Sequence, residues 1–130
     1  MSMDALDLFH AYIDAFNTRN EGALRAVFAP DLRSVHPGEP EVDVTEAAPF
    51  VARMLALWPR GLHYKVLRAA GRDLGDGLTE SWGEMLVFNA EGKVAAAEVV
   101  IYNARAGVVT HTWVYKVMPP THPDYRDATP

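Results

Sequence analysis

The chain contains no cysteine, so it has neither a disulfide framework nor a thiolate metal site. Basic residues are also scarce: 12 Lys and Arg stand against 17 Asp and Glu, a formal net charge of −5. DNA, RNA and anionic membranes bind clusters of Lys and Arg, so we expect no nucleic-acid partner and no membrane partner. No apolar run reaches the roughly 18 residues of a membrane helix, and the first residues show no signal-peptide pattern. These absences predict a soluble, cytoplasmic protein.

Sequence motifs for metal and cofactor chemistry are missing as well. The five histidines show neither HxH nor HxxxH spacing, and no acidic cluster lies beside them. There is no glycine-rich phosphate loop, no nucleophile elbow and no dinucleotide fingerprint. We therefore expect no metal and no cofactor.

What the sequence does contain is the composition of one ordinary globular domain. Of its 130 residues, 49% are hydrophobic and 22% are charged. Residues 119–130 are polar and rich in proline, which predicts a tail after a single domain spanning 1–118.

Apolar residues recur at helical spacing in the first half of the chain. They predict an amphipathic helix over 4–18, and a short second helix that Asn20 caps and Pro30 ends. A third helix is expected from a Thr45 cap to Trp58.

Alternating or β-branched segments follow, and they predict strands over 32–36, 62–70, 78–88, 94–104 and 108–117. The last two are long and free of proline, which favours the middle of a sheet. Helices followed by hairpin-linked strands indicate an α+β fold, with the helices on one face of a curved antiparallel sheet. Such a fold leaves a hollow suited to a small ligand.

In the last strand, one period-2 set is large and mostly apolar, and we expect it to form the wall of a core or pocket: Val109, His111, Trp113, Tyr115 and Val117. This interpretation places His111 inside the protein.

The order of these segments resembles the SnoaL-like members of the nuclear transport factor 2-like superfamily, which includes polyketide cyclases and ketosteroid isomerases. The resemblance covers about residues 4–117 and rests on YIDAFNTRNEGALRAVFAPDL, SVHPGEP, LALWPRGLHYKV and AGVVTHTWVYKV. It implies a cone-shaped α+β barrel, with three N-terminal helices packed on a curved, mostly antiparallel sheet. It also implies a homodimer formed through the outer sheet face.

The resemblance implies roles for a few residues. Tyr12 falls where the isomerases have a tyrosine that donates a hydrogen bond to an enolate. His36 replaces the carboxylate base, and Glu98 is the carboxyl group nearest to the second oxyanion donor. In the last strand, Trp113 is kept, but Val114 replaces the acidic residue of the cyclases.

Each candidate has a structural alternative. His36 can move a proton near neutral pH or merely bind the following loop, and His111 can be catalytic or a core histidine. Tyr12 can donate to an oxyanion or simply pack its ring. Glu84 and Glu98 lie in predicted strands, and each can point to either face of the sheet. The expected wall of core or pocket comprises Phe16, Met54, Trp58, Trp82, Tyr102 and Trp113.

Two hypotheses follow. The first is cofactor-free acid/base catalysis of the isomerase, cyclase or dehydratase kind on a hydrophobic, carbonyl-bearing compound, with His36, Tyr12 and His111 as catalytic residues. The second is a non-catalytic ligand-binding or dimeric association module, because the two acidic positions of the relatives are not acidic here.

Overall fold

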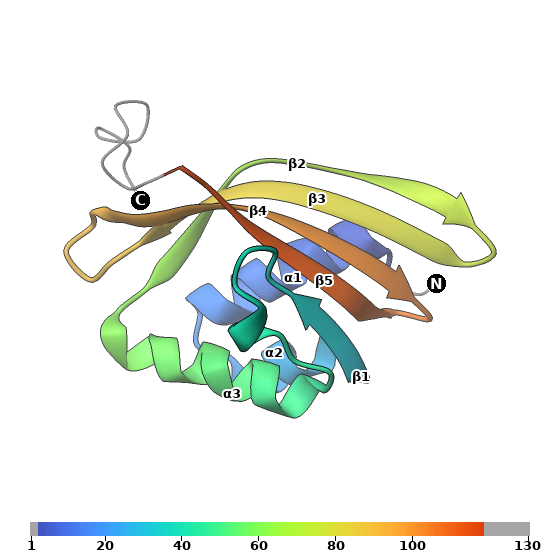
Figure 1. Ribbon diagram of the computed structural model, residues 1–130, viewed down its shortest axis with the longest axis horizontal. Helices are drawn as coiled ribbons and strands as arrows, with labels where there is room; N and C mark the ends of the chain where they lie inside the picture. Colours follow the sequence, from blue (N-terminus) through green and yellow to red (C-terminus); the bar gives the residue numbers. More distant parts are fainter. Residues whose placement is uncertain (1–2, 119–130) are drawn as a thin grey trace.

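A computed structural model describes residues 3–118 as three α-helices lying against one five-stranded sheet (Figure 1). In chain order the elements are α1 (Ala5–Asn17), α2 (Glu21–Ala26), β1 (Phe28–Val35), the 3-10 turn η1 (Pro40–Val42), α3 (Ala47–Leu57), the 3-10 turn η2 (Trp58–Arg60), β2 (His63–Gly75), β3 (Leu78–Phe88), β4 (Val94–Arg105) and β5 (Val108–Met118).

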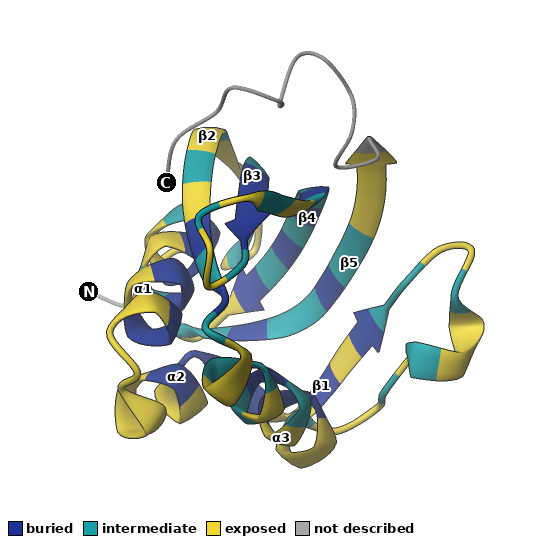
Figure 2. Ribbon diagram, turned by 90° about the vertical axis from the view of Figure 1, so that its left-hand side faces the viewer, coloured by how far each residue is buried: buried dark blue, intermediate teal, exposed yellow. Residues whose placement is uncertain are grey.

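The sheet has the strand order β1-β5-β4-β3-β2, and it curves over the helices (Figure 1). Only β1 runs parallel to its neighbour, β5; the other pairs are antiparallel. The buried residues of α1 face the sheet, and its exposed residues lie on the opposite side (Figure 2). The predicted α+β architecture, with a curved and mostly antiparallel sheet, is confirmed.

The ends of several elements differ from the prediction. β1 begins at Phe28 and includes Pro30, because its pairing with β5 is interrupted between Phe28 and Arg33 and the proline needs no ladder bond there. β2 continues to Gly75 through the expected turn. The tail predicted for 119–130 lies outside the described residues.

The face expected for the last strand is wrong beyond Val109. His111 pairs with Asn103, but Val109 pairs with the adjacent Ala104, so β5 contains a bulge. A bulge adds one residue to a strand, and the alternation then continues on the opposite face. The next three residues of the expected inward set therefore lie on the outer face: His111, Trp113 and Tyr115. Their neighbours face inward instead: Thr112, Val114 and Lys116. Val117 is the extra residue of a second bulge and is 43% exposed.

Aromatic rings form the centre of the core between α1 and the sheet. The Phe16 ring stacks on Tyr64, with 4.1 Å between the ring centroids. The Tyr12 ring meets Phe28 and Tyr102 edge-on, at 5.7 and 6.1 Å. All five residues are buried, so α1 is fixed against β1, β2 and β4 at the point where the cavity begins.

Gly83→Ala is expected to lower the free energy of unfolding by about 1–3 kcal/mol, the usual cost of overpacking a core. A Cβ atom on Gly83 would lie 2.3 Å from the Phe9 ring, which is fully buried, so the ring or the strand would have to shift within the core. Urea denaturation measures the change. Gly22→Ala is the matched control: the nearest atom to its Cβ is 3.8 Å away and it lies within α2, so this variant is expected to be at least as stable as the wild type.

Membrane insertion through a helix has no support in the part of the chain that the structure describes. No helix within residues 3–118 is both long and apolar enough to cross a bilayer.

Candidate functional site

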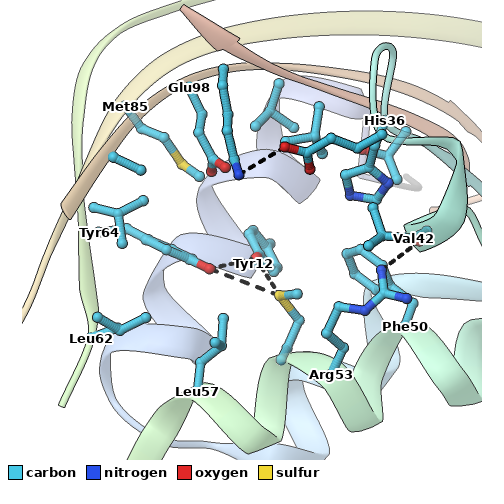
Figure 3. Close-up of a pocket in the computed structure, with 18 of the residues that line it drawn as sticks. Tyr12, His36, Val42, Phe50, Arg53, Leu57, Leu62, Tyr64, Met85 and Glu98 are labelled. Atoms are coloured by element: carbon cyan, nitrogen blue, oxygen red, sulfur yellow. Dashed lines mark hydrogen bonds and ion pairs between the residues drawn. The ribbon is translucent and has the colours of Figure 1, made fainter. Parts of the chain in front are cut away.

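A cavity of about 400 Å³ lies between the helices and the inner face of the sheet (Figure 3). This volume is at the lower end of the range for small-molecule sites. Its wall combines apolar side chains with phenols and ionisable groups. The lining residues are Tyr12, His36, Pro37, Glu39, Val42, Phe50, Arg53, Met54, Leu57, Arg60, Leu62, Tyr64, Met85, Val87, Ala95, Ala96, Glu98, Val100, Tyr102, Thr112, Val114 and Lys116.

Two phenols meet on the wall formed by α1 and β2. The Tyr12 and Tyr64 hydroxyl oxygens are 3.3 Å apart, and Tyr12 Oη lies 3.1 Å from Met54 Sδ (Figure 3). Burial, and then the neighbouring Tyr64, raise the pKa of Tyr12, so the phenol stays protonated and remains a donor. One phenol can donate to the other, which leaves one proton facing only a thioether, a weak acceptor. A ligand oxygen would be a better acceptor for that proton.

A carboxylate occupies the adjacent wall. Burial raises the pKa of Glu98 to about 6, and Glu39 adds to this effect while Lys116 opposes it. The Lys116 ammonium group forms an ion pair with Glu39 Oε1 at 3.0 Å. Glu98 therefore changes its charge near neutral pH and can serve as either an acid or a base.

His36 follows β1 and is held at its backbone by the next loop. Its amide donates to Asp43 Oδ1 at 2.7 Å, and its side chain is 15% exposed. The Nδ1 atom is buried and lies 3.6 Å from Asp43 Oδ1, beyond hydrogen-bond distance. Burial, followed by the Arg53 guanidinium, lowers the pKa of His36, although Asp43 opposes this. The imidazole is therefore held neutral, the form that accepts a proton.

The structure brings five of the predicted site residues to the cavity: Tyr12, His36, Met54, Glu98 and Tyr102. The sequence left open which face of the sheet Glu84 and Glu98 take. Glu98 lies on the inner face, whereas Glu84 lies on the outer face and pairs with Arg68 at 2.7 Å.

The remaining predicted residues do not line the cavity. His111 and Trp113 stack on each other on the outer face, at 5.7 Å, because of the β5 bulge. Trp82 is 42% exposed on the same face. Phe16 is buried in the core, and its ring and the Arg19 guanidinium both pack near Trp58.

Sequence reasoning missed six polar residues of the cavity: Glu39, Arg53, Arg60, Tyr64, Thr112 and Lys116. Tyr64 could have been found from the sequence. It lies in a predicted strand of apolar character, on the opposite face from His63. Arg53 is a charged residue in a helix and would ordinarily be assigned to the solvent face. Thr112 and Lys116 were assigned to the outer face because the bulge before them has no clear sequence signal.

Glu98→Gln is expected to change how the stability depends on pH. A folded-state pKa of about 6 against an ordinary 4.5 means that the folded protein holds this proton more tightly. The proton on Glu98 therefore stabilises the folded protein by up to about 2 kcal/mol. This stabilisation is complete below about pH 4.5 and is lost as the pH rises through about 6. The variant should lack this decline, as measured by urea unfolding between pH 4.5 and 7.5. Glu91→Gln changes an exposed carboxylate and is the control. If stability declines as much in Glu98→Gln as in the wild type or in this control, the raised pKa does not belong to Glu98.

No protein-family model matches this sequence, and no curated protein matches it. Solved structures with the same fold do exist. A Nostoc punctiforme protein of unknown function with a cystatin-like fold has a TM-score of 0.69 at 16% identity, covering 95% of this chain and 98% of that one. A candidate polyketide cyclase from Pseudomonas putida has a TM-score of 0.67 at 17% identity, covering 90% and 94%. An NTF2-like protein of unknown function from Cytophaga hutchinsonii has a TM-score of 0.64 at 17% identity, covering 90% and 93%.

At these identities the likeness shows the fold alone. The fold is that of cystatin-like and NTF2-like proteins, which agrees with the resemblance seen in the sequence.

Proposed function

We propose that this protein binds a hydrophobic, carbonyl-bearing small molecule in its cavity and moves a proton at the carbon next to the carbonyl, without a cofactor. The observation that carries the proposal is the placement of the Tyr12 and Tyr64 phenols, the His36 imidazole and the Glu98 carboxyl group on the wall of one cavity. The candidate polyketide cyclase that shares the fold is in keeping with carbonyl chemistry.

The phenols would stabilise the oxygen that becomes negative. When a base removes the proton, the C–H electron pair forms the enolate and charge moves to the carbonyl oxygen. Tyr12 then donates a hydrogen bond that strengthens as the charge grows, and Tyr64 supports it at 3.3 Å. Because both phenols are buried, their hydrogen bonds to an anion act without competing water.

His36 would be the base. Its Nδ1 atom is buried, so the ring would accept the substrate proton through Nε2. The imidazolium that forms would be stabilised by the Asp43 carboxylate, 3.6 Å from Nδ1. Returning the proton to a different carbon isomerises the substrate, and Glu98 is a second group able to give or take a proton. An enolate is also the first intermediate of an aldol-type cyclisation, so this first step is shared by isomerase and cyclase outcomes.

The test is exchange of α-protons in D₂O, which requires no knowledge of the final product. Flat cyclic ketones such as 2-tetralone are incubated with the protein, and ¹H NMR follows the loss of the α-proton signal. The wild type is expected to accelerate exchange over buffer at equal pH. Exchange at the buffer rate for a ketone that binds in the cavity would overturn catalysis.

A second candidate function is ligand binding without catalysis. Val114 lines the cavity in the strand where the resemblance implies an acidic residue, so the wall is less polar there than the cyclase pattern requires. Saturable ketone binding by the wild type, with exchange at the buffer rate, would favour this alternative.

We also propose that the protein forms a homodimer through the outer sheet face. Trp82 pairs with Ile101, which pairs with Trp113, so an apolar row crosses three strands. Trp82, Tyr115 and Val117 are 42%, 37% and 43% exposed. A second copy would cover this face. Light scattering at micromolar concentration should give twice the chain mass of 14.4 kDa, and a monomeric mass would refute the proposal.

A further inference from the structure

Arg53 is a charged residue of the cavity wall that has no counter-charge among residues 3–118. It extends from α3 towards the loop after β1, where Nη1 donates to the Val42 carbonyl oxygen at 2.6 Å (Figure 3). Its side chain is partly buried, and no carboxylate within 3–118 pairs with it. A guanidinium group has five N–H donors, so most of its hydrogen-bonding capacity is unused. A partly buried charge without a partner costs free energy unless a ligand supplies the opposite charge.

A second unused polar group lies on the neighbouring strands. The Thr112 hydroxyl is fully buried, lines the cavity and has no hydrogen-bond partner among the described residues. Thr112 pairs with Ser34 of β1, and His36 lies two residues further along that chain segment. The Arg53 charge acts on the His36 ring, and Arg53, His36 and Thr112 all line the cavity. Buried hydroxyls are normally satisfied, and an exception at a cavity wall is a place for a ligand atom.

We propose that Arg53, with the Thr112 hydroxyl as a second donor, binds a carboxylate of the substrate, so that the compound taken by this site is a cyclic keto acid. The inference rests on the proposed function, since it describes the other end of the same substrate. The ketone oxygen would lie at Tyr12 and Tyr64, and the carboxylate would lie at Arg53.

The spacing along α3 supports a compact substrate. Arg53 and Met54 are adjacent in the chain, and Met54 Sδ lies 3.1 Å from the Tyr12 hydroxyl. Both residues line the cavity from α3, so one helix would contact both ends of a compact substrate. His36 lines the cavity and feels the Arg53 charge, so its ring would lie near the carbon atoms that join ketone and carboxylate.

The other charged side chains that line the cavity are the exposed Arg60 and the group of Glu39, Glu98 and Lys116. Lys116 pairs with Glu39 at 3.0 Å and also acts on Glu98, whose pKa it lowers, so its charge is already opposed by two carboxyl groups. Glu98 lies on the wall near this pair and would repel a doubly charged phosphate. A carboxylate matches the planar fork of one guanidinium group and needs no further cation.

The experiment compares a matched pair of probes, a tetralone carboxylic acid and its methyl ester, by calorimetry and by the D₂O exchange assay. The wild type is expected to bind the acid about 10- to 100-fold more tightly than the ester, the value of a charged hydrogen-bonded pair. Arg53→Met should weaken binding of the acid by about the same factor and leave the ester unchanged. Arg33→Met, which removes an exposed arginine of β1 outside the cavity, is the control and should keep the preference for the acid.

Two further variants keep the test decisive if loss of the Val42 contact disturbs the fold. Arg53→Lys retains the charge and should retain part of the preference for the acid, and Thr112→Val should reduce it. Equal binding of acid and ester by the wild type overturns the carboxylate subsite, and so does a preference that survives in Arg53→Met. If the ester is bound and exchanged in that case, the proposed function stands without the subsite. If the acid and the ester bind equally tightly but neither undergoes catalysed exchange, both proposals fail; if neither probe binds, the carboxylate subsite is overturned.

Discussion

Tyr12→Phe is expected to slow α-proton exchange of a bound cyclic ketone by about 10²-fold, with little change in the Kd of the ketone. Removing one oxyanion donor typically costs about 10²–10³ in rate, and the neighbouring Tyr64 phenol places this case at the lower end. The hydrogen bond to the enolate is strong only when charge has developed, so kcat should fall more than KM rises. The exchange assay in D₂O gives both constants.

The fold should tolerate this change. The hydroxyl contacts only Met54 Sδ and Tyr64 Oη, while the ring makes the packing contacts with Phe28 and Tyr102. Tyr115→Phe is the matched control, because Tyr115 lies on the outer face and is 37% exposed. It should exchange protons at the wild-type rate. A wild-type rate in Tyr12→Phe would remove the phenol from the mechanism and leave it a packing residue.

Much of the fold was predictable because its signals are local. The apolar stripe of α1, the Asn20 cap and the glycine turns between strands each depend on a few neighbouring residues. The order of helices and strands then limits the ways in which an apolar helix face can cover a sheet. The resemblance of the segments added the cone shape of the barrel to the curved sheet that this order predicts.

The candidate site was less predictable because it depends on register. The bulge at Val109 and His111 exchanged the two faces of β5, and this removed His111 and Trp113 from the cavity and brought in Thr112 and Lys116. One misplaced residue reverses a whole strand. Arg53 shows a different limit, since a charged residue at a partly buried position has the same local sequence pattern as one in solvent. Only the tertiary contacts of α3 distinguish the two cases.

His36→Ala is expected to reduce α-proton exchange by about 10³-fold, close to the buffer rate. A general base contributes about 10²–10⁴ in rate, and the His36 imidazole is held neutral by burial and by the Arg53 charge. Because its pKa is lowered from the ordinary 6.5, the acid limb of the rate profile should lie below that pH. Measurement of the exchange rate between pH 5 and 8 tests both statements.

The fold should survive His36→Ala because the backbone amide, which is unchanged, makes the 2.7 Å bond to Asp43. His10→Ala, an exposed histidine of α1, is the matched control and should exchange protons like the wild type. The alternative base in the same cavity is Glu98, which has a pKa of about 6. If exchange survives in His36→Ala but disappears in Glu98→Gln, the carboxylate is the base and the imidazole is structural. Loss in both variants would instead mean that exchange at the α-carbon requires both groups.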